Sequence, residues 1–245
     1  MNIAFDAKRA FSNTTGLGNY SRTLIQSLAA YYPQHEYFLC APKLTDAFPM
    51  YQYKNLHSVT PQKFPSNFFT SAWRSSWVKN DLKKLNVDLY HGLSHEVPVG
   101  IQKTNIKSVV TIHDLIFERY PEQYHPIDVF IYRRKFQYAC RYADAIIAIS
   151  EQTKKDIIEF YKISEEKITV CYQSCIAAFG EQAAASEKEK VKSKNGLPAE
   201  FFLYVGSVIE RKNLLTICKA LHALKDKLDI PLVVIGDGDN YMNQV

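Results

Sequence analysis

The stretch Ser108–Leu115, which reads SVVTIHDL, decides the fold. Its four consecutive β-branched residues, 109–112, form a short apolar run typical of a strand buried on both faces of a parallel sheet. The run ends at His113 and Asp114, an imidazole beside a carboxylate. Ligands of open α/β sheets lie at the carboxyl ends of the strands, so both residues are candidates for catalysis. The structural alternative is that Asp114 caps the next segment and that neighbouring groups satisfy His113.

Strands and helices alternate along the rest of the chain. Short apolar runs indicate the strands, and apolar residues at helical spacing indicate the helices. This alternation predicts an α/β protein with a doubly wound, Rossmann-like parallel sheet. A polar loop is expected between the first strand and Gly16, and the Pro- and aromatic-rich region 42–70 gives no clear pattern. The expected strands are 2–5, 37–40, 87–90, 108–112, 145–149, 168–170, 201–205 and 232–235, and the expected helices are 16–32, 73–85, 127–142, 151–160 and 214–224.

The composition is that of a globular protein with ample material for a core: 47% of the 245 residues are hydrophobic and 22% are charged. No apolar run reaches the roughly 18 residues of a membrane span, and Asp6, Lys8 and Arg9 interrupt any secretory signal. The five cysteines form no C-x-x-C pair and are typical of thiols in a reducing compartment, so we expect a cytoplasmic protein. A net charge of +5 fits anionic ligands or an acidic membrane surface better than nucleic acid.

The composition shifts after residue 172, and this shift predicts the domain organisation. Residues 1–172 are expected to form the first Rossmann-like domain, and 173–198, rich in Ala, Glu and Lys, a linker with a surface helix. Residues 199–245 begin a second Rossmann-like domain. Two strands and one complete helix cannot close a doubly wound sheet, so we expect this domain to be incomplete and the chain to be a truncated product.

A pair of glycines, Gly16 and Gly18, opens one of the expected helices. The pair does not match the dinucleotide-binding fingerprint, which follows its strand at once and has a third glycine where this chain has Ser21. The free amides and the dipole of a helix N-terminus favour an anion, which makes both glycines candidates for phosphate binding. A role in turn geometry alone is the alternative.

The second domain repeats this design. A strand leads into Gly206, and two adjacent cations, Arg211 and Lys212, precede the next helix. A planar guanidinium fork beside an ammonium point charge suits a diphosphate. A solvated charged turn is the structural alternative.

Taken together, segments spread along the whole chain resemble the retaining, GT-B-fold glycosyltransferases of family 4, also called group 1. No single segment is specific, but their order is. The matching segments are TGLGNY (15–20), DLYHG (88–92), TIHDL (111–115), AISEQTKKD (148–156), YVGS (204–207) followed by RKNL (211–214), and VIGDG (234–238).

The resemblance implies a two-domain enzyme with its site in the cleft between the domains. The first domain would hold the acceptor and the second a nucleotide-diphosphate sugar. His113 would sit beside the transferring sugar, Gly16 and Gly18 near the donor phosphates, and Arg211 and Lys212 against the leaving diphosphate. Fixed cations and amide dipoles aimed at that phosphate would supply most of the rate.

The resemblance further implies sugar transfer with retention to a glycan or lipid-linked acceptor, in polysaccharide or cell-surface glycan biosynthesis, without a metal or other cofactor. Candidate residues on the acceptor side are Asn19, Tyr20, His91 and Ser150.

The chain also departs from the family pattern. Ser207 stands where the family often has Arg, and the family's two donor-binding glutamates would lie beyond Val245. We therefore expect the first domain to fold but the 245-residue chain to have little transferase activity. The alternative function is a non-catalytic, glycosyltransferase-like binding module.

Two further patterns carry weaker hypotheses. Asp237-Gly238-Asp239 is a D-x-D sequence that would chelate a divalent metal in the other major glycosyltransferase fold, although it is also an ordinary turn sequence. The stripe Trp73, Arg74, Trp77, Lys79, Lys83 and Lys84 is a candidate for peripheral contact with an anionic membrane at its inner face. The structural alternative is a helix that is half core and half solvated.

Overall fold

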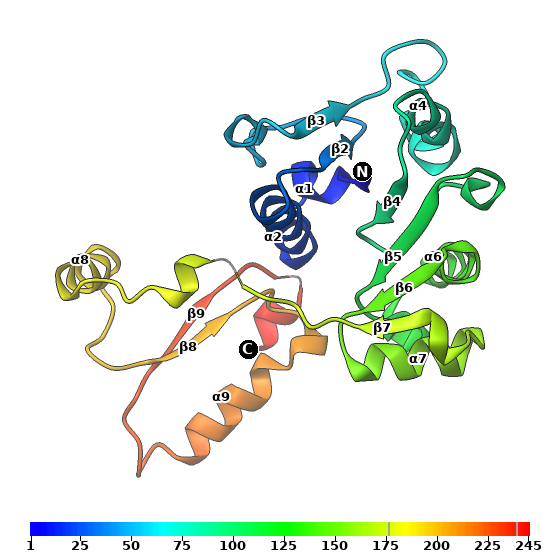
Figure 1. Ribbon diagram of the computed structural model, residues 1–245. Coiled ribbons are helices and arrows are strands. Elements are labelled where there is room, and N and C mark those ends of the chain that lie inside the picture. Colours follow the sequence, from blue (N-terminus) through cyan, green and yellow to red (C-terminus); the bar gives the residue numbers. More distant parts are fainter. Residues whose placement is uncertain (176, 239) are drawn as a thin grey trace. The chain divides into compact units, whose positions relative to one another are not determined.

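The computed structural model describes residues 1–175, 177–238 and 240–245 and divides into two compact units, Met1–Ile176 and Ala177–Val245 (Figure 1). Each unit is described by itself. Among the described residues, none of the helices combines the length and apolar composition that a membrane span requires.

Unit 1 contains a seven-stranded sheet in the order β3-β2-β1-β4-β5-β6-β7, and every neighbouring pair is parallel. The doubly wound sheet that the sequence predicts is confirmed. Its strands are β1 (Asn2–Asp6), β2 (Glu36–Cys40), β3 (Leu56–Val59), β4 (Leu89–Gly92), β5 (Lys107–Ile112), β6 (Ala145–Ala148) and β7 (Ile168–Val170). Its helices are α1 (Lys8–Ser12), α2 (Gly16–Tyr31), α3 (Thr70–Ala72), α4 (Val78–Lys84), α5 (Ile116–Arg119), α6 (Pro126–Tyr142) and α7 (Glu151–Tyr161).

The strands bury side chains on both faces of this sheet. Ala4 and Cys40 lie in a hydrophobic cluster that includes residues of α4 and α6, whereas Phe5 and Leu39, their neighbours along the strands, lie in a cluster with residues of α1 and α2. Helix α6 contacts β5, and α7 contacts β6 and β7 (Figure 1). Because helices cover both faces, β5 is enclosed: Val110, Thr111 and Ile112 are buried and Val109 is half-buried, in keeping with the sequence.

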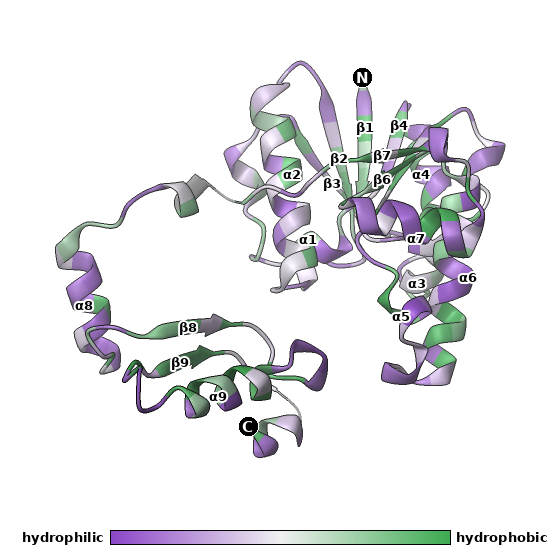
Figure 2. Cartoon of the chain, turned by 90° about the horizontal axis from the view of Figure 1, so that it is seen from below, coloured by the Kyte–Doolittle hydropathy of each residue, from purple (hydrophilic) through white to green (hydrophobic). Residues whose placement is uncertain are grey.

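Unit 2 contains the parallel pair β8 (Phe202–Val205) and β9 (Leu232–Ile235), with α8 (Ala185–Asn195) and α9 (Leu214–Ala223). The two strands end in glycines that approach each other closely, because a Cβ at Gly236 would lie 1.8 Å from the carbonyl oxygen of Gly206. Figure 2 shows hydrophobic colour along β8 and β9 and mostly hydrophilic colour on α8. No described residue of α8 is buried, in keeping with the surface helix expected there.

The structure departs from the expectations in some segments and assigns one that the sequence left open. The expected polar loop before Gly16 contains α1, and the unassigned region 42–70 contains the edge strand β3. The expected helix 73–85 begins with a π-helical turn, Trp73–Trp77. Trp73 is fully buried and Arg74 is held in an internal ion pair, so the basic and aromatic stripe is partly core, as the structural alternative held.

Candidate active site

The candidate site is built where β5 ends, around the imidazole of His113. His113 is 7% exposed, and both nitrogens of its ring have protein partners. Nε2 lies 2.9 Å from the carbonyl oxygen of Leu93, and Nδ1 lies 2.8 Å from the amide nitrogen of Gln173. The expected place of His113 at the carboxyl edge of the sheet is confirmed, and the ring lies inside that edge, held from two sides.

Two further contacts fix the backbone and the ring of His113. Its carbonyl oxygen accepts a hydrogen bond from the hydroxyl of Thr153 at 3.0 Å, which ties the end of β5 to the first turn of α7. The ring of Tyr20, from α2, meets the imidazole edge-on with centroids 4.7 Å apart. Sequence reasoning did not single out Thr153, because a threonine inside a helix carries no signal of its own.

Three buried histidines gather at this edge. His91, in β4, lies with Nε2 2.8 Å from the hydroxyl of Thr111, and His95 stacks on Phe136 with ring centroids 4.2 Å apart. Burial lowers the pKa of His91 to about 4, holds that of His95 well below its usual range and lowers that of His113, against a smaller opposing effect of the Leu93 carbonyl. The cluster is therefore neutral at physiological pH and acts through hydrogen bonds rather than charge.

The hydroxyl of Thr111 joins two of the candidate acceptor-side residues. It lies 3.1 Å from the hydroxyl of Tyr20 as well as 2.8 Å from His91 Nε2. Burial raises the pKa of the Tyr20 hydroxyl, which stays protonated. The structure thus brings Tyr20, His91 and His113 together, on three different elements.

The side chains of Asp114 and Ser150 each bind a backbone amide at the start of a helix. Asp114 is exposed, and its Oδ1 accepts from the backbone amide of Ile116, which begins α5; this is the capping role weighed as the alternative. Ser150 is the N-cap of α7, and its hydroxyl accepts from the amide of Thr153 at 3.1 Å. Neither side chain contacts the His113 ring among the described hydrogen bonds.

The two glycines at the start of α2 have different surroundings. A Cβ at Gly18 would lie 1.8 Å from the carbonyl oxygen of Asn13, so the close approach of the preceding loop requires glycine there. The amide of Gly18 donates to Asn13 Oδ1. A Cβ at Gly16 would meet no atom within 4 Å, so nothing in its described surroundings explains this glycine. Asn19 is exposed, and its side chain accepts from Arg22.

A buried ion network at the same edge was missed by sequence reasoning. Asp6, the last residue of β1, accepts from Arg74 Nε at 2.9 Å, and Arg74 also donates to Glu96 at 3.0 Å. Glu96 follows His95, which has a left-handed backbone with φ of 65°. The network therefore fixes the loop that presents Leu93 and His95. Three residues so distant in sequence carry no pairing signal.

In unit 2, Arg211 and Lys212 are exposed in a 3-10 turn, Glu210–Lys212, directly before α9. Among the residues that the structure describes, neither Arg211 nor Lys212 forms an ion pair with an acidic side chain. Cations next to the positive end of a helix dipole repel it unless an anion binds there. Ser207, the departure from the family pattern, is exposed, and its carbonyl accepts from the hydroxyl of Tyr204.

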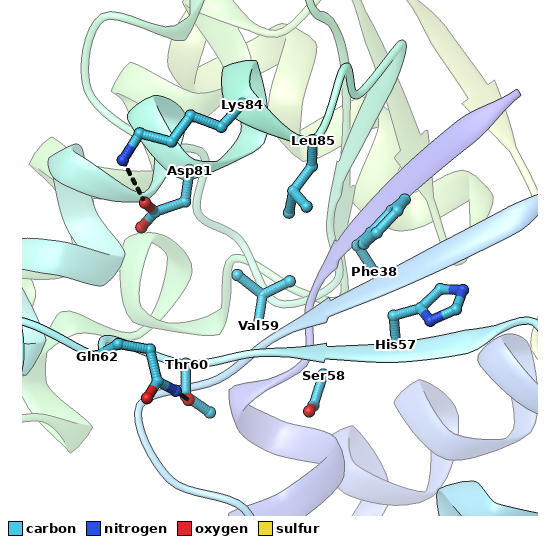
Figure 3. A pocket seen from close by; sticks show the side chains of 9 residues that line it. All are labelled: Phe38, His57, Ser58, Val59, Thr60, Gln62, Asp81, Lys84 and Leu85. Carbon is cyan, nitrogen blue, oxygen red and sulfur yellow. Dashed lines mark hydrogen bonds and ion pairs between the residues drawn. The ribbon is translucent and has the colours of Figure 1, made fainter.

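Two other features lie outside this site. Within 1–175, 177–238 and 240–245, no group of His, Cys, Asp or Glu side chains could hold a metal ion, and Asp239 of the D-x-D hypothesis lies outside the described residues. Figure 3 shows an open hollow of about 440 Å³ between β2, β3 and α4, in which Phe38, Val59 and Leu85 line the wall and Lys84 pairs with Asp81. None of the residues around His113 lines that hollow.

Comparison with known protein families identifies the family of this chain. The model of Glycosyltransferase Family 4 matches residues 14–174, which include α2, the carboxyl end of β5 and Gln173. The chain belongs to glycosyltransferase family 4.

Relatives of this family 4 chain include the serotype-specific mannosyltransferase WbdA of Escherichia coli. One such sequence is 30% identical over 151 residues, which are 58% of this chain and 18% of WbdA. Another is 31% identical over 131 residues, 51% of this chain and 16% of WbdA. The chain thus spans less than a fifth of the length of these relatives.

Solved structures show the fold. HepE of Anabaena, in complex with UDP and glucose, matches with a TM-score of 0.65 and 16% identity, over all of this chain and 64% of HepE. WaaG, a glycosyltransferase involved in lipopolysaccharide biosynthesis, matches with a TM-score of 0.67 and 18% identity, over all of this chain and 65% of WaaG. The family 4 chain therefore has the GT-B type of fold that its sequence predicts.

Proposed function

We propose that the protein containing this chain transfers a sugar, with retention, from a nucleotide-diphosphate sugar to a glycan or lipid-linked acceptor in the biosynthesis of a polysaccharide. The observation that carries the proposal is the family match over 14–174, because this range holds every side chain around the His113 ring. The likeness to WbdA, a mannosyltransferase, and to WaaG, a glycosyltransferase involved in lipopolysaccharide biosynthesis, supports the same class of reaction.

The charge of the leaving group is the main chemical demand of this reaction. Cleaving the bond between the sugar and the diphosphate builds negative charge on the departing phosphate, and preorganised donors stabilise that charge. In this proposal Arg211 and Lys212 neutralise the diphosphate, and Gly16 leaves room for it at the start of α2. The open space around a Gly16 Cβ and the exposed, unpaired cations of the described turn support these roles.

His113 is proposed to contact the transferring sugar. Since both ring nitrogens are engaged, this contact requires the ring to exchange the Leu93 carbonyl for a sugar hydroxyl, to which Nε2–H then donates. A neutral ring suits this role, because it positions a hydroxyl without adding charge beside an anomeric carbon that becomes positive. His113 therefore acts as a hydrogen-bond donor, and Asp114 serves the turn that follows it.

The proposal includes no metal and no cofactor, because the two cations of unit 2 supply the charge that a metal would supply. We expect turnover to be unaffected by a chelator. A rate that vanishes with EDTA and returns with Mg²⁺ or Mn²⁺ would restore the D-x-D hypothesis.

Peripheral membrane contact remains part of the proposal for a lipid-linked acceptor. Its support comes from exposed apolar side chains in two segments that follow the carboxyl ends of β3 and β5: Phe64, Phe68, Phe69, Ile127, Phe130 and Ile131. Co-sedimentation with vesicles that contain anionic lipid, weakened by Phe68→Ser, is the expected result. Equal sedimentation of the variant and the wild type would rule out this surface.

The proposed function is tested by incubating the intact protein with a panel of nucleotide sugars and measuring the release of nucleoside diphosphate. GDP-mannose and UDP-glucose are the first probes, because WbdA is a mannosyltransferase and the structure of HepE holds UDP and glucose. Retention predicts an α-linked product from an α-linked donor, read from the anomeric coupling in proton NMR spectra. Tight binding of a nucleotide sugar without release of diphosphate would instead establish a non-catalytic binding module.

A further inference from the structure

Gln173 is the side chain that completes the surroundings of His113, and it comes from a distant segment. It lies after β7, sixty residues along the chain from His113, and its amide nitrogen is 2.8 Å from His113 Nδ1. The segment starts from a fixed point, because the amide of Cys171 donates to the carbonyl of Ala148 at 2.9 Å. The exposed side chain of Gln173 is thus held by a hydrogen bond to the buried ring of His113.

The hydrogen-bond directions around the ring are determined by chemistry. A carbonyl oxygen only accepts, so the ring must donate to Leu93 from Nε2–H. In a neutral imidazole the other nitrogen is then an acceptor, and Nδ1 requires a donor. Gln173 supplies it with its amide N–H. The two contacts together specify a single neutral tautomer.

We propose that Gln173 is a positioning residue that holds His113 as the neutral Nε2–H tautomer, so that the Nε2–H can pass from the Leu93 carbonyl to a substrate hydroxyl while Nδ1 stays anchored. During that exchange the Leu93 contact is absent, and Gln173 alone maintains the ring's tautomer and orientation. This role rests on the proposed function, whereas the hydrogen bond itself does not.

The other groups near the ring do not offer Nδ1 a donor. Tyr20 of α2 meets the ring edge-on and uses its hydroxyl on Thr111. His95, in the loop after β4, receives the backbone amide of His113 on its Nδ1, and His91 is engaged with Thr111. Asp114, the next residue in the chain, raises the pKa of His113 slightly against the effect of burial. Among the described residues, the amide of Gln173 is therefore the one hydrogen-bond donor to Nδ1 of His113.

The amide chemistry of Gln173 distinguishes it from its isosteres. Methionine has similar length but no N–H, so it would leave Nδ1 without a partner. Glutamate has the same shape but only accepts, so it favours a ring that is protonated at Nδ1 as well. Methionine therefore removes the hydrogen bond to Nδ1, whereas glutamate raises the pKa of the ring. Both substitutions keep the length of the side chain nearly unchanged.

The experiment is a ¹⁵N-edited NMR titration of the imidazole signals in the 245-residue chain, in the wild type, Gln173→Met and Gln173→Glu. The wild type is expected to show one neutral His113 species with its proton on Nε2. In Gln173→Met the Nδ1 resonance should move toward that of an unbonded nitrogen. In Gln173→Glu the midpoint of the titration should rise by about one pH unit or more. The signals of His222, in unit 2, are the internal reference.

Gln152 provides the matched control, because its amide also donates, but to Asp156 in α7. Gln152→Met is expected to leave the His113 signals unchanged. An Nδ1 resonance that is the same in Gln173→Met and the wild type, or a titration midpoint that Gln173→Glu does not move, would overturn the proposal.

Activity of the intact protein separates this proposal from the proposed function. We expect Gln173→Met to lower kcat by about tenfold with little change in the KM for the nucleotide sugar, and Gln173→Glu to move the pH profile upward. An unchanged kcat with altered NMR signals would refute the positioning role and leave the transferase intact. A wild type that turns over no nucleotide sugar would refute the function and leave the hydrogen bond standing.

Discussion

Replacing Gly18 with alanine should destabilise unit 1 strongly, whereas the same change at Gly16 should not. A Cβ at Gly18 would lie 1.8 Å from the carbonyl oxygen of Asn13 and 2.7 Å from its carbonyl carbon, so the backbone of Asn13 must move. That residue anchors the loop: its Oδ1 accepts from the amides of Thr15 and Gly18 at 2.9 and 3.0 Å, and its carbonyl accepts from Arg22 at 2.9 Å.

The magnitude follows from these hydrogen bonds. Two neutral bonds are worth about 1 kcal/mol each, and the bond to the guanidinium about 2 kcal/mol. Alanine regains roughly 1 kcal/mol of helix propensity, which leaves a net loss of about 3 kcal/mol. For a unit of this size the loss corresponds to a fall in Tm of about 6–12 °C.

The assay is urea and thermal unfolding of the two variants, followed by circular dichroism. Gly16→Ala should stay within about 0.5 kcal/mol of the wild type, because its Cβ meets no atom within 4 Å. It should nevertheless weaken nucleotide-sugar binding if phosphate occupies that space. A Gly18→Ala variant that melts with the wild type, or a Gly16→Ala variant that loses as much stability, would refute the steric argument.

Other perturbations have outcomes of similar clarity. Burial lowers the pKa of folded His91 to about 4, whereas the pKa of an unfolded histidine is near 6.5. The free energy of unfolding therefore falls as the pH drops below about 6.5, because the unfolded chain takes up a proton that the folded chain excludes. Urea unfolding should show a loss of about 2 kcal/mol from His91 between about pH 7.5 and pH 5, and a free energy of unfolding that does not change over this range would contradict it. Asp6→Asn leaves the guanidinium of Arg74 buried with only a partial counter-charge, and should lower the free energy of unfolding by about 3 kcal/mol; a change below the error of a denaturant melt would exclude a structural role for the pair. The double change of Arg211 and Lys212 to alanine should weaken binding of a nucleoside diphosphate, measured by calorimetry, by about tenfold or more while leaving the Tm unchanged; unaltered affinity would remove both cations from the donor site.

The sequence predicted the frame of the site because local patterns determine it. The β-branched run of β5 required burial on both faces, and that burial placed His113 at the carboxyl edge of the sheet. The same logic found the helix that starts at Gly16, since the spacing of apolar residues is a property of neighbouring residues. Nothing local predicted the partners of the imidazole.

Those partners depend on the path of the chain between elements. Leu93 offers its backbone carbonyl, which is independent of its side chain, and the loop that turns it inward depends on the left-handed backbone of His95. Gln173 reaches the ring only because β7 lies beside β6 in the sheet. The stripe at Trp73 is partly core, and the sequence left this open because its period fits a buried face as well as a solvated one.

The most direct test of the account is the release of nucleoside diphosphate from nucleotide sugars by the intact protein, compared between the wild type and His113→Ala. The account predicts turnover by the wild type and a loss of about a hundredfold or more in the variant, because in the proposed function the imidazole donates a hydrogen bond to the transferring sugar. Equal rates in the two proteins, or no release from any nucleotide sugar of the panel by the wild type, would contradict it.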